Sequence, residues 1–316
     1  MKRIYKALAW FFGIVILIMV IALFTFYQPD IPVEKLKAVY SNASSEFMEL
    51  KGMQVHFRDE GNASDSIPLV LIHGTGAFLQ TWDACTAEWT KDYRVIRMDM
   101  PAFGLTGPAP DNDYSIEAYV DFLHHFLQNR KVNRCYLAGN SLGGLIAYSY
   151  AAAYPGEVKK LILVDAAGYP IENAKGSLAF TLGRIPVVKQ LLKIVTPASV
   201  VRKSLEDVYG NKARVTDALV KQYRDMACRE GNRNALLIRL NNPQSGDTTI
   251  VPEIKVPTMI IWGDLDFLIP LDNAYKFQRD LPNDTLVVLK GIGHVPMEES
   301  PEQVIPLVKN FIGNGR

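Results

Sequence analysis

The stretch that decides the fold class is Cys135-Tyr136-Leu137-Ala138-Gly139-Asn140-Ser141-Leu142-Gly143-Gly144. Its first four residues are predicted to form a buried strand, and a helical run begins at Leu142. A serine on so sharp a strand-to-helix turn adopts strained backbone angles, and Gly139 and Gly143 leave room for it. The turn lifts the Ser141 hydroxyl clear of the sheet, where the helix N-terminus favours developing negative charge. Ser141 is therefore the candidate nucleophile.

Apolar, β-rich runs alternate with helical patterns on both sides of this turn. Because these runs are continuously hydrophobic, they indicate a sheet buried on both faces, which is typical of a mainly parallel α/β fold. The predicted strands are a hairpin over Phe47–Leu50 and Gln54–Arg58, then Pro68–Ile72, Arg94–Met98, Cys135–Ala138, Leu161–Val164, Thr258–Trp262 and Thr285–Leu289. The predicted helices include Ser115–Gln128, Leu142–Ala153 and Glu302–Ile312.

A serine hydroxyl is a poor nucleophile and needs a general base. Among the five histidines, His294 follows the last predicted strand and precedes the final helix. That loop lies at the carboxyl edge of the sheet, where the active sites of open α/β sheets collect. His56 lies in an early strand and His124 and His125 inside a helix, which favours structural or surface roles. His73 opens a glycine turn.

The base must in turn be oriented by an acid. Asp264 and Asp266 follow the strand Thr258–Trp262, again at the carboxyl edge of the sheet. Asp165, at the end of an earlier strand, is a third candidate, although a structural role at that strand end is favoured.

The oxyanion that forms when a serine attacks a carbonyl needs two backbone N–H donors. One is expected from Leu142, the residue after the nucleophile. The other is expected from the loop His73-Gly74-Thr75-Gly76, because its glycines let the chain turn sharply and present an amide. Thr75 is the predicted donor in that loop.

These motifs resemble those of the α/β-hydrolase superfamily, most closely its capped esterase/lipase and meta-cleavage-product hydrolase branch, from Phe47 to Ile312. The resemblance implies a doubly wound sheet, a Ser-Asp-His triad in that chain order, and no cofactor or metal. In that family the acid is the aspartate three residues after the glycine of the Trp-Gly element, which matches Asp266. Similar dehalogenases and epoxide hydrolases use an aspartate nucleophile, so Ser141 argues against both. The motifs that fall in family order are His73–Gly76, Asp99-Met100-Pro101-Ala102-Phe103-Gly104, Gly139–Gly144, Trp262-Gly263-Asp264-Leu265-Asp266 and Gly293-His294.

A long insertion separates two of the predicted strands. The interval from Val164 to Thr258 is several times longer than the dozen or so residues that a crossover between parallel strands needs. Its amphipathic pieces, Pro186–Val195 and Ala213–Arg229, predict a helical cap over residues 168–252, with the hydrolase core at 46–167 and 253–316; the alternative is an ordinary surface excursion. The residues that predict an apolar underside of the cap are Leu178, Phe180, Leu182, Ile185, Val188, Leu191 and Leu192.

The chain begins with an uncharged apolar run of 21 residues, Ala7–Tyr27. As a helix it would span roughly 30 Å, the thickness of a bilayer core. It is longer than a signal-peptide core and lacks a cleavage site of small residues. We therefore expect a membrane anchor over residues 1–28 and a tether over 29–45. Because Lys2, Arg3 and Lys6 precede the run, the N-terminus is predicted to be cytoplasmic and the catalytic domain extracytoplasmic, periplasmic in a Gram-negative host.

Composition excludes other classes of protein. Lys and Arg number 34 against 33 Asp and Glu, and a net charge of +1 argues against a dedicated nucleic-acid binder. Cys85, Cys135 and Cys228 have neither metal-site spacing nor an even count, so we expect buried thiols rather than a disulfide scaffold.

The expected function is a membrane-anchored serine hydrolase that cleaves apolar or lipid-like carboxylic esters through an acyl-enzyme intermediate. The main alternative is a carbon–carbon bond hydrolase of the meta-cleavage type, since the same elbow and triad occur there. A cofactor-independent peroxidase-like activity and a catalytically silent binding protein with the same fold are further alternatives.

Overall fold

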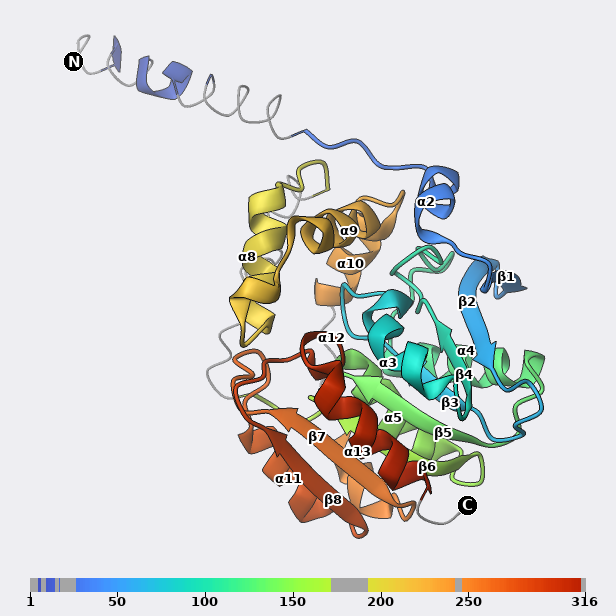
Figure 1. The fold of residues 1–316 in the computed structure, drawn as a ribbon. Coiled ribbons are helices and arrows are strands. Elements are labelled where there is room, and N and C mark those ends of the chain that lie inside the picture. Colours follow the sequence, from blue (N-terminus) through green and yellow to red (C-terminus); the bar gives the residue numbers. More distant parts are fainter. Residues whose placement is uncertain are drawn as a thin grey trace.

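The computed structural model describes residues 5–6, 10–14, 17, 27–171, 193–241 and 246–313. An eight-stranded sheet, in the order β1-β2-β4-β3-β5-β6-β7-β8, forms the centre of the fold (Figure 1). The strands are β1 (Ser45–Leu50), β2 (Met53–Gly61), β3 (Leu69–Ile72), β4 (Arg94–Met98), β5 (Cys135–Asn140), β6 (Val158–Val164), β7 (Thr258–Gly263) and β8 (Asp284–Leu289). The α-helices are α2 (Val33–Tyr40), α3 (Asp83–Trp89), α4 (Ile116–Asn129), α5 (Leu142–Ala153), α8 (Ala198–Val208), α9 (Asp217–Ala227), α10 (Asn232–Asn241), α11 (Asp272–Asp280), α12 (Pro296–Glu299) and α13 (Pro301–Gly313).

The sheet is mainly parallel, as the sequence predicts. Strand β2 pairs antiparallel with β1 and β4, and the remaining neighbours from β4 to β8 pair in parallel. The predicted hairpin joins β1 to β2 through Lys51 and Gly52, both with positive φ. The carboxyl ends of β3, β5, β6, β7 and β8 therefore meet at one edge, and the loops that follow them carry the candidate site residues.

Both faces of the sheet are buried, because side chains alternate along each strand. In β3, Val70 and Ile72 pack into one hydrophobic cluster with residues of α4, α5 and α11. Leu69 and Leu71 point the other way and pack with residues of α3 and α13. This two-sided burial confirms the interpretation of the continuously hydrophobic strands.

Between β6 and β7 the described part of the insertion is helical. Figure 1 shows α8, α9 and α10 together at one end of the sheet, outside the layers of helices that cover its faces. The predicted amphipathic piece Ala213–Arg229 contains α9. The residues named for the apolar underside lie outside the described residues, as does most of Pro186–Val195. The bounds of the predicted cap therefore stay a prediction.

The segment predicted to be a tether packs against the insertion. The amide of Gln28 donates to the carbonyl of Ile194 at 2.9 Å, and that of Ile31 to the carbonyl of Cys228 at 2.8 Å. Helix α2 follows, and its Leu36 is buried in a small cluster with Phe78, Leu105 and Met226. Hydrogen bonds to the backbone and apolar burial thus tie residues 28–40 to the rest of the fold.

The predicted localisation is corrected by the structure. Of the apolar run Ala7–Tyr27, residues 7–9, 15–16 and 18–26 lie outside the described residues. A spanning helix must be both continuous and apolar over about 20 residues. Among the helices in the described part of the chain, none meets both conditions. The prediction of a single-pass membrane protein with an extracytoplasmic catalytic domain was therefore wrong; it rested on the hydropathy of this run and on the charges that precede it.

Candidate active site

Ser141 occupies the sharp turn between β5 and α5. Its backbone has φ 55° and ψ −118°, a conformation that costs a non-glycine residue about 1–3 kcal/mol. The two glycines of the motif make this turn possible. A Cβ at Gly139 would lie 2.1 Å from the carbonyl oxygen of Gly143, and a Cβ at Gly143 would lie 2.4 Å from that of Ile72. The backbone strain therefore lies at Ser141, the candidate nucleophile predicted from the sequence.

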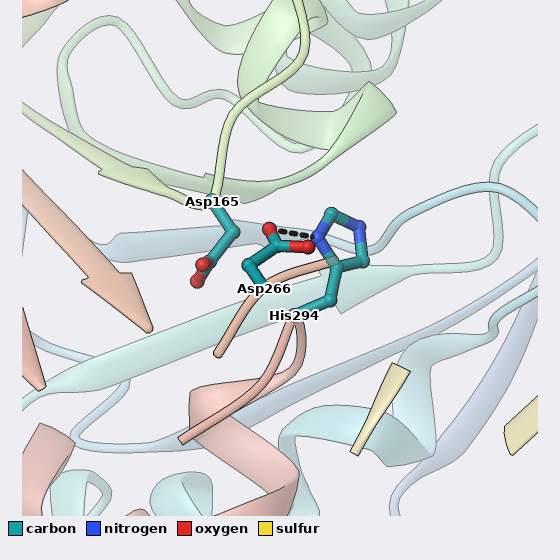
Figure 2. A group of neighbouring side chains, drawn as sticks. All are labelled: Asp165, Asp266 and His294. Carbon is teal, nitrogen blue, oxygen red and sulfur yellow. Dashed lines mark hydrogen bonds and ion pairs between the residues drawn. The ribbon is translucent and has the colours of Figure 1, made fainter. Parts of the chain in front are cut away.

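His294 and Asp266 are hydrogen-bonded to each other. Nδ1 of His294 lies 2.6 Å from Oδ2 of Asp266, and both side chains are buried (Figure 2). The other oxygen of Asp266 accepts the backbone N–H groups of Leu268 and Ile269 at 2.8 and 2.9 Å. Three donors therefore hold this carboxylate in one orientation. With Asp266 as acceptor, His294 carries its proton on Nδ1 and leaves Nε2 free.

The three candidate acids have different partners. Asp264 accepts the backbone N–H of Gly291 at 2.6 Å and so closes a turn. Asp165 is fully buried and accepts the N–H of Gly263 at 2.9 Å. Of the three, Asp266 is the residue bonded to His294.

The turn at Ser141 contacts two further loops at the carboxyl edge. The side-chain Nδ2 of Asn140 donates to the carbonyl of His294 at 2.9 Å and to that of Val164 at 3.1 Å. On the other side Gly74 packs so closely that a Cβ there would lie 3.0 Å from Cβ of Ser141. Ser141 therefore lies between the His294 loop and the predicted oxyanion loop.

His73 holds the predicted oxyanion loop in place. Its Nδ1 lies 2.8 Å from the carbonyl oxygen of Gly74, and its Nε2 accepts the N–H of Met100 at 3.0 Å. Burial lowers the pKa of His73, which favours the neutral ring that this bonding pattern requires. Leu142, the other predicted donor, is the first residue of α5, and a helix leaves its first N–H groups without an intrahelical partner.

Glu299 joins the His294 loop to the insertion. Its buried carboxylate accepts three backbone N–H groups: Gly293 at 2.8 Å, Gly210 at 3.0 Å and Asn211 at 2.6 Å. In addition, the N–H of His294 donates to the carbonyl of Val208, the last residue of α8, at 2.7 Å. The backbone position of His294 therefore depends on the turn that follows α8.

A cavity of about 200 Å³ lies beside the oxyanion loop. Thr75 and Gly76 contribute to its wall, and Arg233 is the charged residue among its described lining. Nη2 of Arg233 pairs with Asp30 at 2.5 Å. The rest of the wall is mostly aliphatic and comes from the insertion: Val195, Pro197, Val200, Val201, Leu205, Val208, Ala227, Leu236, Leu237 and Leu240.

Asp165, Asp266 and His294 are also candidate metal ligands. One potential ligand atom from each of these residues lies within 4.8 Å of the other two. A zinc ion would stand about 2.0–2.2 Å from each ligand atom. The 2.6 Å between His294 and Asp266 is a hydrogen-bonding distance and leaves too little room for an ion between them. The donor set fits a hydrogen-bonded pair better than a metal site.

A second Ser–His–Asp chain occurs near the edge of the sheet. Nδ1 of His56 lies 2.7 Å from Asp99, and Nε2 lies 3.0 Å from Oγ of Ser45. Ser45 is on strand β1 and already accepts hydrogen bonds from Nε of Arg58 and from the backbone N–H of Asn42. It has neither a helix N-terminus nor a glycine turn beside it, so this chain has a structural role, as expected for His56.

The remaining candidates lie away from this site. On helix α4, His124 stacks on Tyr154 with ring centroids 4.2 Å apart, and His125 is exposed. Cys85, Cys135 and Cys228 are free, buried thiols, which confirms that expectation.

The sequence did not predict the contacts of two residues that shape the site, Asn140 and Glu299, or the closeness of Asp165 to Asp266. Asn140 stands inside the elbow motif, but nothing local indicates that its side chain reaches His294. Glu299 follows His294 by five residues in a short helix, and its acceptor role depends on the insertion. The closeness of Asp165 to Asp266 follows from the adjacency of β6 and β7, which the parallel strand order could have indicated.

Comparison with known proteins agrees with this architecture. The model of the "Alpha/beta hydrolase family" matches residues 69–307, well over half of the chain. Lipase 1 of Psychrobacter immobilis is 29% identical over 82% of this chain and 81% of its own length. The 2-hydroxy-6-oxo-2,4-heptadienoate hydrolase of Pseudomonas putida is 27% identical over 83% and 93%. The crystal structure of a meta-cleavage product hydrolase from Pseudomonas fluorescens superposes with a TM-score of 0.75, at 22% identity, over 86% of this chain and 98% of its own. The chain belongs to the α/β-hydrolase family.

Proposed function

We propose that this hydrolase cleaves carboxylic esters with an apolar acyl group, using Ser141 as nucleophile, His294 as general base and Asp266 as the acid that orients it. The observation that carries the proposal is the 2.6 Å hydrogen bond between Nδ1 of His294 and Asp266. This bond favours the tautomer whose free Nε2 can take a proton from a serine hydroxyl. The strained turn at Ser141 supports the choice of nucleophile.

In the proposed reaction, Oγ of Ser141 attacks the ester carbonyl carbon while Nε2 of His294 takes the hydroxyl proton. The N–H groups of Leu142 and Thr75 donate hydrogen bonds to the oxyanion. His294 then returns the proton to the departing alcohol, and the acyl group remains on Ser141. A water molecule, deprotonated by His294, attacks the acyl-enzyme, and the carboxylic acid leaves as Ser141 regains its proton.

The cavity supports an apolar acyl group. Thr75 and Gly76, in the loop proposed to hold the oxyanion, form one part of the cavity wall, and the aliphatic side chains form the rest. Because this loop packs against Ser141, an acyl chain bound in the cavity would have its carbonyl near Ser141. Each CH₂ group buried against such a wall contributes about 0.8 kcal/mol. The similarity to Lipase 1 agrees with an ester substrate.

The alternative is cleavage of a carbon–carbon bond. It is suggested by the relatives named as hydrolases of 2-hydroxy-6-oxo-dienoates, whose names describe substrates with a carboxylate. Such a carboxylate would need a cation in the cavity. Arg233 is the charged residue in the described part of the cavity wall, and it already pairs with Asp30. We therefore favour the ester.

Two assays test the proposal. A fluorophosphonate probe should label the wild-type protein and fail to label Ser141→Ala, while Ser45→Ala, which alters the structural Ser–His–Asp chain, should be labelled like the wild type. A series of p-nitrophenyl esters should show kcat/KM rising with acyl length until the cavity is filled. Absence of labelling in the wild type would indicate a silent binding protein. Turnover of a 2-hydroxy-6-oxo-dienoate but not of esters would indicate the carbon–carbon hydrolase.

A further inference from the structure

Asp165 is a second buried carboxyl beside the proposed acid, and the ester chemistry above does not use it. It follows strand β6, is fully buried, and has a backbone φ of 45°. Figure 2 shows its side chain next to those of Asp266 and His294. One carboxylate oxygen of each aspartate and one ring nitrogen of His294 lie within 4.8 Å of one another.

The two carboxyls receive different numbers of hydrogen bonds. Asp266 accepts three, from the ring of His294 and from two backbone N–H groups. Asp165 accepts one, from Gly263 on Oδ1, and its Oδ2 has no hydrogen-bond donor facing it among the described residues. Stabilisation of the ionised form by hydrogen bonds therefore favours Asp266 over Asp165.

Electrostatics points the same way. Two carboxylates this close in a buried site repel each other, so one of them keeps a proton. Burial raises the pKa of Asp165 well above its usual range, and the negative charges of Asp266 and Glu299 raise it further, against the opposing hydrogen bond from Gly263. One carboxyl oxygen of Asp165 and one of Asp266 lie within 4.8 Å of each other.

We propose that Asp165 is a neutral carboxylic acid that positions Asp266, with its proton on Oδ2 and its hydroxyl donated to the Asp266 carboxylate. This inference rests on the proposed function, because the consequence of that hydrogen bond appears in the proton transfer at His294. A donor to Asp266 makes that carboxylate less basic, so the proton that His294 takes from Ser141 stays on the imidazole. An ionised Asp165 would instead place a second negative charge beside the ring.

The pH dependence of kcat/KM distinguishes the two states of Asp165. Asp165→Asn keeps the shape, stays neutral and retains an N–H donor toward Asp266. The fall of its kcat/KM at low pH, the acidic limb of the profile, should therefore coincide with that of the wild type, with kcat/KM within about threefold.

Asp165→Ala removes the donor, so Asp266 becomes more basic and His294 is protonated more readily. The acidic limb of this variant should therefore move to higher pH. Asp280→Asn, which removes a carboxylate on α11 that pairs with Arg279, is the control and should leave the profile unchanged. An acidic limb that moves to lower pH in Asp165→Asn would mean that Asp165 is ionised, and would overturn the proposal.

A spectroscopic readout makes the test independent of catalysis. The infrared difference spectrum of wild type minus Asp165→Asn at pH 7 should contain the carbonyl stretching band of a protonated carboxylic acid. Absence of that band would refute the neutral Asp165 whatever the enzyme hydrolyses. Presence of the band in a protein that hydrolyses no ester would refute the proposed function and leave the protonation of Asp165 standing.

Discussion

The side-chain amide of Asn140 donates a 2.9 Å hydrogen bond to the backbone carbonyl of His294, and so joins the turn at Ser141 to the loop that carries the proposed base. The same Nδ2 donates to Val164 at the end of β6. A single buried side chain thus sets the spacing between β5, β6 and the loop after β8. The geometry of the proposed triad depends on this contact as well as on the triad residues themselves.

Asn140→Ala should lower both activity and stability. The carbonyl of His294 loses its donor, which costs about 1–3 kcal/mol of unfolding free energy, whereas that of Val164 keeps the backbone N–H of Ser141. Because the His294 loop loses this hydrogen bond, kcat should fall by a larger factor than KM rises. Urea unfolding and steady-state ester kinetics measure the two effects. The control is Asn129→Ala, whose exposed side chain donates to the carbonyl of His125 within α4. Equal losses in the two variants would contradict a special role for Asn140.

Asp266→Asn should cost far more activity than Asp264→Asn. Of these two aspartates, Asp266 is the one hydrogen-bonded to His294, and an amide in its place favours the wrong tautomer of the ring, a change worth on the order of 10⁴ in kcat. Asp264→Asn should chiefly weaken the turn at Gly291. Both are checked by kcat on a short p-nitrophenyl ester, with circular dichroism to verify folding. A larger loss in Asp264→Asn would show that the acid is misassigned.

Glu299→Gln should loosen the link between the His294 loop and the insertion. The carboxylate accepts N–H groups on both oxygens, whereas the NH₂ group of glutamine cannot accept and would face at least one donor. We expect a loss of about 1–3 kcal/mol in unfolding free energy and a lower kcat. Glu302→Gln, on the exposed start of α13, is the matched control. Unchanged stability and kcat in Glu299→Gln would show that the contacts of Glu299 do not hold the loop.

Glu298 should make stability depend on pH near neutrality. Its carboxylate accepts the hydroxyl of Tyr223 at 2.9 Å, and burial raises its pKa to about 7 from 4.5, against the opposing hydrogen bonds of Tyr223 and Tyr209. Because the folded-state pKa lies above the unfolded one, the stabilising contribution is complete below pH 4.5 and is lost as the pH rises through 7. The loss should be on the order of 3 kcal/mol.

Urea unfolding between pH 5 and pH 8 measures this effect. Glu298→Gln cannot ionise, so its free energy of unfolding should fall less over that interval than that of the wild type. Glu230→Gln, which alters an exposed carboxylate of the insertion, should fall in parallel with the wild type. A wild-type curve that rises between pH 5 and pH 8, with Glu298→Gln flat, would reverse the predicted sign.

The sequence determined the sheet and the order of the loops around it. Continuous apolar runs such as those of β5 and β7 predict buried parallel strands, because in such a sheet both faces of every strand are covered. The elbow at Ser141 is equally local, since two glycines within two residues of the serine leave room for the strained turn. The apolar run Ala7–Tyr27 led to the wrong localisation, because among the helices in the described part of the chain none is long and apolar enough to cross a membrane.

Only the tertiary structure decided which side chains meet. Asp264 and Asp266 are two residues apart and follow the same strand, yet the turn directs one to the amide of Gly291 and the other to His294. Asn140 reaches His294 across 154 positions of sequence, and Glu299 holds backbone from the insertion. Such contacts depend on where β6, β7 and the insertion come to lie in space. Local sequence fixes the strand ends, but the geometry between them is set by the packing of the whole sheet.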